Sequence, residues 1–258
     1  MIFKFLEGSR VTRIPGSFKV FSWLCSIFGN PTIEVFDFRM QTLVYSRKKY
    51  VLFYSENYEQ NVVNVFKNLL LRRIHPVVID VGSSIGFYTL LASKLVDNGL
   101  IYSIEPDPFR FAVLNDNLTI NNAKNVRAIN CLASSGGGEQ LMKFEDPKTG
   151  ILQNFKIKRV RLDTLTNRAD VVKIDVEGAE LDVLKGAMEI LKNGAAIICE
   201  VHPKEMKTFD HDVWDLFEFI KDFDYNIYRI RENGSLEKIC EPLLDRAHYL
   251  FMPEEVSI

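Results

Sequence analysis

The stretch VVIDVGSSIGFYTLLASKLV, residues 77–96, combines an apolar segment, a turn with two glycines and a run of apolar residues at helical spacing. Residues 77–81 have the length of a buried strand, and Gly82 and Gly86 permit a sharp turn directly after it. Beyond Gly86 the apolar side chains recur on one helix face. The stretch therefore predicts a strand, a tight turn and a helix in immediate succession.

This alternation of strand and helix recurs along the chain. Further apolar segments of strand length, most of them leading into a helical pattern, cover residues 100–105, 125–131, 171–176 and 195–201. Strands that are apolar on both faces and alternate with helices are typical of a parallel sheet covered on both sides. The pattern predicts a doubly wound α/β fold.

The last two strand-like segments, 225–230 and 247–252, break this alternation. Between them lies no helical pattern but the turn pair Asn233-Gly234, which favours antiparallel pairing. We therefore expect a mostly parallel, seven-stranded, Rossmann-like sheet with an antiparallel last strand.

We expect residues 1–73 to form an α+β extension that packs on a core domain of residues 74–258. We expect short strands in TIEVFDF (32–38), TLVYS (42–46) and YVLFY (50–54), then a helix near residues 58–73. The glycines and proline of residues 134–161 predict an inserted loop with short strands such as QLMKF. Before these strands, five apolar residues fall at helical spacing: Val20, Phe21, Leu24, Ile27 and Phe28. We expect this stripe to pack on its own domain. The alternatives are a homo-oligomer contact or a contact with a membrane surface.

Charge and cysteine content narrow the function classes. Lysine plus arginine (32) and aspartate plus glutamate (34) nearly cancel, so no broad basic surface is expected to bind nucleic acid. The four cysteines form no CxxC pair, which fits a reduced intracellular protein. No apolar run approaches the roughly 20 residues of a bilayer span, and the first residues lack a signal-peptide core. We expect a cytoplasmic protein without a transmembrane segment.

The glycine turn and the acid after the next strand predict a cofactor site. Glu105, at the end of segment 100–105, is placed to accept both hydroxyls of an adenosine ribose. The dinucleotide pattern GxGxxG needs a glycine where this chain has Ser84, which disfavours a pyrophosphate. Asp80 would repel phosphates but attract an ammonium group, so S-adenosylmethionine fits best. The predicted cofactor contacts are Asp80, Gly82, Ser83, Ser84, Gly86, Glu105, Pro106, Leu132 and Asp175. The simpler reading is a tight turn followed by a solvated loop acid.

Four polar side chains follow two neighbouring strands and predict the catalytic centre. Asp175 and Glu177 end one strand, and Glu200 and His202 end the next. His202 is the candidate base that deprotonates an acceptor hydroxyl, with Asp175 or Glu200 orienting it. The same four residues could hold a divalent metal ion, which the absence of a tight ligand motif disfavours. In the structural alternative, Glu177 and Glu180 stabilise a helix N-terminus and His202 closes a loop.

The other histidines, His75, His211 and His248, have no acid at a recognisable spacing and are interpreted as surface or packing residues. Asp163, in VRLDTL, either caps a turn before the fourth strand or faces the cofactor, and the structural role is favoured. Neither group enters the predicted site.

Several segments, between residues 77 and 203, resemble the FkbM family of S-adenosylmethionine-dependent methyltransferases within the class I Rossmann-like fold. They are IDVGSSIGFYT, IYSIEPDPFRFAVLNDNLTINN, VRLDTL, VVKIDVEGAELDVLKGA and ICEVHP. The family usually has Ala-Asn at Ser83-Ser84 and a small hydroxyl residue at Arg161. The resemblance implies O-methylation of a hydroxyl on a small molecule, sugar or glycan. The alternatives are a cofactor-binding module without catalysis and, less favoured, an RNA methyltransferase.

Overall fold

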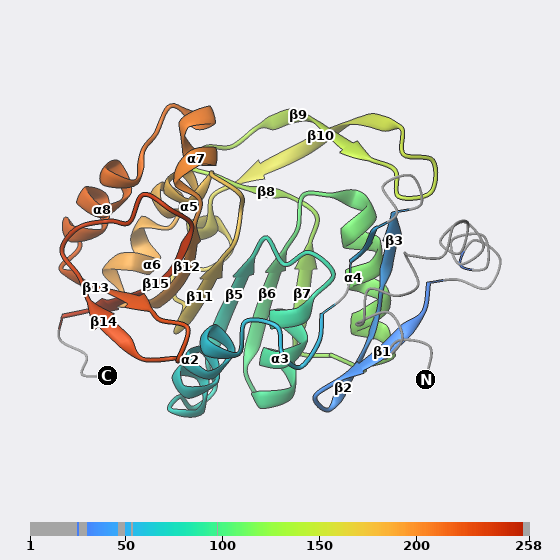
Figure 1. Cartoon of the computed structure of the whole chain (residues 1–258), viewed down its shortest axis with the longest axis horizontal. Helices are drawn as coiled ribbons and strands as arrows, with labels where there is room; N and C mark the ends of the chain where they lie inside the picture. Colours follow the sequence, from blue (N-terminus) through green and yellow to red (C-terminus); the bar gives the residue numbers. More distant parts are fainter. Residues whose placement is uncertain (1–24, 26–29, 46–49, 53, 97, 255–258) are drawn as a thin grey trace.

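The computed structural model describes residues 25, 30–45, 50–52, 54–96 and 98–254 (Figure 1). The centre of the described part is an eight-stranded sheet with the spatial order β14 (Leu236–Lys238), β13 (Tyr225–Ile230), β15 (Ala247–Pro253), β12 (Ala196–Val201), β11 (Val171–Ile174), β5 (Val77–Val81), β6 (Leu100–Ile104) and β7 (Val126–Ile129). The predicted α/β fold with a large, mostly parallel sheet is confirmed.

The direction of the strands changes at β15. Strands β12, β11, β5, β6 and β7 run parallel, whereas β15 lies antiparallel to both β12 and β13. The Asn233-Gly234 turn joins β13 to the short β14, and the chain then returns as β15. The antiparallel end is therefore as predicted, but the sheet has one strand more than expected because β14 was not recognised.

Helices cover both faces of the sheet and divide the core into two clusters. Val78 and Ile101 belong to one cluster, together with side chains of α2 (Gln60–Leu71), α3 (Phe87–Leu95) and α4 (Pro108–Ile120). Ile79 and Val81 belong to the other, together with side chains of α5 (Glu180–Lys185), α6 (Met188–Lys192) and α8 (Val213–Lys221). Because successive side chains of one strand enter opposite clusters, both faces must be apolar.

Short helices connect these elements: η3 (Leu162–Thr164), α7 (Pro203–Met206) and η4 (Lys207–Phe209), of which η3 and η4 are 3-10 helices. Asp163 in η3 accepts hydrogen bonds from the backbone N–H groups of Glu189 (3.1 Å) and Ile190 (3.3 Å). Its role in the structure is to hold the start of α6, and Arg161 contacts its other oxygen at 3.1 Å.

The described part of the N-terminal region packs against α3 and α4. It forms a hairpin of β1 (Thr32–Val35) and β2 (Phe38–Gln41), followed by β3 (Leu43–Tyr45) and β4 (Tyr50–Leu52). The expected single strand over residues 32–38 is wrong, because Phe36 takes a positive φ of 51° and turns the chain. The apolar stripe of residues 20–28 lies outside the described residues, and the domain division after residue 73 stays a prediction.

The segment 134–161 is more regular than predicted. After β8 (Leu132–Ala133) it forms a long hairpin of β9 (Glu139–Glu145) and β10 (Leu152–Val160). Met142 and Phe155 pair on one face of the hairpin, while Leu141 and Lys156 pair on the exposed face. In Figure 1 the hairpin extends from the α7 side of the molecule toward α4 at the end of the sheet where β5 and β6 terminate. The alternating pattern, rather than the glycines, determined the local structure.

In the part of the chain that the structure describes, none of the helices combines the length and apolar character of a membrane span. Cys25, Cys131, Cys199 and Cys240 are free thiols.

Candidate active site

A cavity of about 730 Å³ lies where the parallel strands β5, β6 and β11 end. Its floor is formed by residues that directly follow these strands: Gly82 and Ser84, Glu105 and Pro106, and Asp175 and Glu177. The β9 strand of the hairpin contributes Gln140, Met142 and Phe144 to the opposite wall. Ligands of open α/β sheets bind at this end of the strands, so the cavity has the expected location.

The glycine turn follows β5 and is bonded to the end of β6 at the edge of the cavity. Gly82 and Gly86 have φ angles of 78° and 97°, which side-chain-bearing residues rarely adopt. The backbone N–H groups of Gly82 and Ser83 both donate to the carbonyl oxygen of Ile104, at 2.9 and 3.0 Å. The turn is thereby fixed to the end of β6, next to Glu105.

Glu105 is held in a single orientation at the cavity wall. Its side chain is only 4% exposed, and its oxygens accept hydrogen bonds from the backbone N–H groups of Ser84 (2.7 Å) and Asp107 (2.8 Å). Burial raises the pKa of this carboxyl to about 7, although Arg110 acts in the opposite direction. Each oxygen accepts one of these bonds and keeps capacity for a second. A freely solvated loop acid is therefore excluded.

Other predicted cofactor contacts lie at different depths. Pro106, Leu132 and Ser84 line the cavity, whereas Ser83 and Gly86 do not. The Asp80 carboxylate lies beneath the turn, where it accepts a hydrogen bond from the Thr89 hydroxyl at 2.6 Å. Direct contact between Asp80 and an ammonium group in the cavity is thus not what the structure shows.

The four predicted catalytic side chains come together, in two layers. Asp175 and Glu177 line the cavity, and Glu200 and His202 lie behind them, 0% and 2% exposed. The His202 Nε2 atom lies 3.5 Å from Glu177 Oε2 and 3.9 Å from Glu200 Oε1. The sequence-based grouping is geometrically consistent, but His202 does not itself face the cavity.

The residue that orients His202 is one that the sequence analysis did not select. Glu180, at the start of α5, accepts a hydrogen bond from His202 Nδ1 at 2.7 Å and is fully buried. Its Oε1 atom also accepts from the backbone N–H of Gly178 at 3.0 Å. The expectation that Asp175 or Glu200 orients the imidazole is therefore wrong, because the first turn of α5 places Glu180 on the other ring nitrogen.

Glu200 joins this cluster to a second histidine. Arg246 donates from Nε to Glu200 Oε1, and His248 Nε2 lies 3.5 Å from Glu200 Oε2 and 3.6 Å from Glu59 Oε1. Burial opposes ionisation of Glu200, but His248 and Arg246 outweigh it and hold its pKa well below the usual range. The interpretation of His248 as a residue without an acid partner is wrong, since strand pairing places it opposite Glu200.

The N-terminal region also supplies residues that were not anticipated. Tyr54 and Tyr58 line the cavity, and the Tyr54 ring stacks on Phe87 with a centroid distance of 5.1 Å. Glu59 accepts a hydrogen bond from the Tyr88 hydroxyl at 2.8 Å. His211, interpreted from the sequence as a surface or packing residue, also lines the cavity. The sequence around these residues contains no motif or periodic spacing that would have indicated a place in the site.

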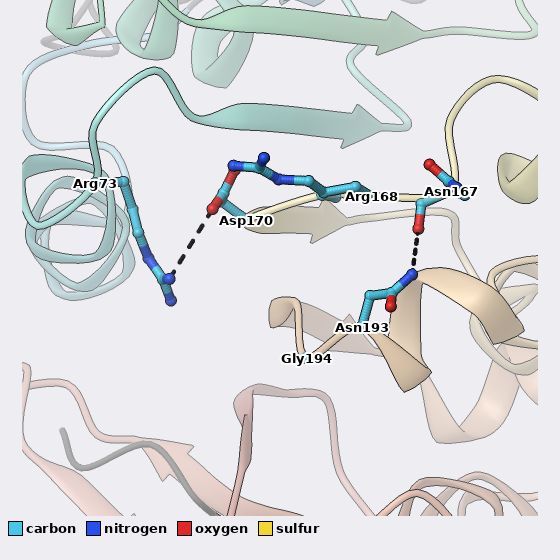
Figure 2. A pocket seen from close by; sticks show the side chains of 7 residues that line it. Arg73, Asn167, Arg168, Asp170, Asn193 and Gly194 are labelled. Atoms are coloured by element: carbon cyan, nitrogen blue, oxygen red, sulfur yellow. Dashed lines mark hydrogen bonds and ion pairs between the residues drawn. The ribbon is translucent and has the colours of Figure 1, made fainter.

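A second, smaller cavity of about 380 Å³ lies at the opposite ends of the strands (Figure 2). Its polar groups contact one another: Asp170 lies 3.9 Å from Arg73 and 3.4 Å from Arg168, and Asn193 donates to the carbonyl oxygen of Asn167 at 2.8 Å. Asp170 also accepts from the backbone N–H of Val77 at 2.8 Å, which ties β5 to the start of β11. These contacts indicate a structural role.

Residues 80–234 match the family model described as the methyltransferase FkbM domain. The chain belongs to the FkbM methyltransferase family. The match includes the glycine turn, Glu105 and the Asp175–His202 cluster, while Tyr54, Tyr58 and Glu59 lie before it.

Curated relatives of this FkbM-family chain include methyltransferase sdnD of Sordaria araneosa, 28% identical over 159 residues that cover 45% of this chain and 61% of the relative. The hexuronic acid methyltransferase AglP of Haloferax volcanii is 30% identical over 139 residues, which cover 49% of this chain and 56% of the relative. The matches thus span less than two thirds of these relatives.

Solved structures show the same fold at low sequence identity. A putative rRNA-methylase from Clostridium thermocellum has a TM-score of 0.51 at 14% identity, with coverage of 78% of this chain and 97% of its own. A putative transferase from Pyrococcus horikoshii has a TM-score of 0.50 at 15% identity, with coverage of 92% and 82%.

Proposed function

We propose that this protein is an S-adenosylmethionine-dependent O-methyltransferase that acts on a hydroxyl group of a small molecule, sugar or glycan. The observation that carries the proposal is one cavity in which Glu105 and the glycine turn lie beside the carboxylates Asp175 and Glu177. Family membership and a relative described as a hexuronic acid methyltransferase support it.

The residues around Glu105 fit an adenosine ligand. A buried carboxylate with acceptor capacity facing a cavity suits the two hydroxyls of a ribose, and the adjacent Pro106 and Leu132 offer apolar surface for the base. Bound S-adenosylmethionine would supply the methyl group as an electrophile. Asp80 acts from beneath the turn, where its charge favours a cationic ligand without touching it.

The side of the cavity formed by Asp175 and Glu177 accepts the proton of the acceptor hydroxyl. Asp175 and Glu177 face the cavity and are the groups that an acceptor hydroxyl can reach directly. His202 and Glu200 lie behind them and hold their positions and charge. The hydroxyl must also lie in line with the transferred methyl group, so the wall formed by Gln140, Met142 and Phe144 positions the acceptor.

Affinity for the cofactor product S-adenosylhomocysteine is expected to rise with pH through about 7. The pKa of Glu105 in the free protein is raised to about 7, and the ionised form is the better acceptor for ribose hydroxyls. The group is mostly protonated at pH 6 and mostly ionised at pH 8, so the dissociation constant should fall about tenfold between these values.

Calorimetric titration of the wild type, Glu105→Gln and the exposed control Glu218→Gln tests this expectation. Glu105→Gln should weaken binding at pH 8 by about 1–3 kcal/mol and flatten the pH dependence. Glu218→Gln should behave as wild type. Unchanged affinity in Glu105→Gln would refute the ribose assignment.

His202→Ala is expected to reduce methyl transfer strongly while leaving affinity for S-adenosylhomocysteine nearly intact. His202 lies behind the acceptor-facing carboxylates and makes no contact with the turn or with Glu105. The measurement is turnover to S-adenosylhomocysteine with a panel of sugar and small-molecule hydroxyl acceptors, beside calorimetry. A large loss of affinity for S-adenosylhomocysteine in His202→Ala would show that His202 does not belong to the acceptor side of the cavity. If the wild type binds S-adenosylhomocysteine but turns over no acceptor, a non-catalytic module is favoured.

A further inference from the structure

The cluster behind the cavity has the dimensions of a metal coordination sphere. One ligand atom from each of Asp175, Glu200 and His202 lies within 4.8 Å of the others. Two oxygen or nitrogen ligands at about 2.0–2.6 Å from one ion lie at most about 4–5 Å apart. Small side-chain movements therefore suffice to bring these atoms onto a common ion.

The hydrogen bond of His202 fixes the ring for such a role. The Glu180 carboxylate can only accept, so Nδ1 carries the proton and, in the neutral ring, Nε2 presents its lone pair. Nε2 is buried, makes no hydrogen bond to any described residue and points toward the carboxylates of Glu177 (3.5 Å) and Glu200 (3.9 Å). A lone pair directed at two carboxylates is unfavourable, so this position stabilises either a second ring proton on Nε2 or a bound cation. Metal-bound histidines characteristically donate their other ring N–H to a carboxylate.

The local charge favours a divalent ion. Four carboxylates surround the imidazole, those of Asp175, Glu177, Glu180 and Glu200. Three basic groups lie near them: Arg246 contacts Glu200 Oε1, His248 Nε2 lies 3.5 Å from Glu200 Oε2, and Lys173 acts on Asp175, Glu59, Glu200 and Asp80. The four carboxylates around His202 outnumber the permanent cations Arg246 and Lys173, so the cluster attracts a further cation.

We infer that Asp175, Glu200 and His202 bind a divalent metal ion of the Mg²⁺ or Mn²⁺ type, with Glu177 as a further ligand from the cavity side. Carboxylates with a single imidazole suit such ions. This inference rests on the proposed function, because the ion would contact the acceptor hydroxyl beside Asp175 and favour its deprotonation.

A second cluster of similar size, formed by Glu59, Glu200 and His248, is the less suitable site. None of its three residues lines the cavity, whereas Asp175 of the first cluster does. An ion there would not reach an acceptor. The two clusters therefore provide matched variants for an experiment.

Electron paramagnetic resonance with Mn²⁺ on the purified 258-residue chain tests the inference without any turnover. We expect stoichiometric Mn²⁺ binding by the wild type and none by His202→Gln. The outer-ligand variant Glu180→Gln should lose about 10- to 100-fold in Mn²⁺ affinity. His248→Gln should bind Mn²⁺ as the wild type does. Because Glu177 is 70% exposed, Glu177→Gln keeps the fold and should still weaken binding measurably.

Any one of three results overturns the inference. The first is that the wild-type protein, shown by circular dichroism to be folded, binds no Mn²⁺. The others are that Mn²⁺ binding is lost only in His248→Gln, or that turnover is undiminished in excess chelator. Calorimetry with S-adenosylhomocysteine, run in chelator, separates this from the proposed function. A protein that binds the cofactor product but not Mn²⁺ refutes the metal site only, whereas a protein that does not bind the cofactor product refutes the proposed function.

Discussion

Lys173→Met is expected to lower the free energy of unfolding by about 3–5 kcal/mol, because it leaves buried carboxylates without their cation. Lys173 lies on β11 in the centre of the sheet and is 1% exposed. Its Nζ atom lies 5.1 Å from the centroid of the Tyr88 ring. Burial alone would lower the pKa of this ammonium group, but four carboxylates outweigh burial and hold it above the usual value: Asp175, Glu59, Glu200 and Asp80.

Urea unfolding of matched variants measures the effect. Lys156→Met removes an exposed lysine from β10 and should change stability by less than about 0.5 kcal/mol. Asp80 is the register partner of Lys173 on β5, so Lys173→Met combined with Asp80→Asn should be less destabilised than the sum of the single changes. Equal unfolding midpoints for Lys173→Met and Lys156→Met would show that the buried ammonium group is not needed.

The parts of the fold that depend on local patterns could be predicted from the sequence. Residues 77–96 contain a strand, a turn and a helix in consecutive order, and each is specified by apolar spacing and two glycines. Glu105 and Asp175 follow such strands directly. Because parallel strands end at one edge of the sheet, their shared location in one cavity followed from local reasoning alone.

The remaining site residues could not be predicted, because strand order and register bring them together. His248 meets Glu200 only because β15 inserts antiparallel beside β12, about fifty positions later in the chain. Glu59 reaches the same cluster from the start of α2. Lys173 was visible as a charge inside an apolar strand, but its partner Asp80 depends on the pairing of β11 with β5. Such contacts require the tertiary fold.

Gly82→Ala is expected to destabilise the protein by about 2–5 kcal/mol and to abolish tight cofactor binding. A Cβ atom at this position would lie 1.8 Å from the backbone carbonyl oxygen of Asp175, and the φ of +78° disfavours any side chain. The left-handed conformation costs about 1–2 kcal/mol and the overlap about 1–3 kcal/mol more. Relief of the overlap must move the turn away from β11 and disturb the Ser84 N–H bond that orients Glu105.

Gly137→Ala provides the matched control, because an added Cβ there meets no described atom within 4 Å and the backbone is not in the left-handed region. It should stay within about 0.5 kcal/mol of wild type. Thermal unfolding and calorimetry with S-adenosylhomocysteine measure both effects on the same samples. Because Gly82 contacts both β6 and β11, a Gly82→Ala protein as stable as Gly137→Ala would mean that the turn is free to move. In that case the close contact between the end of β5 and Asp175 would not determine the form of the cavity.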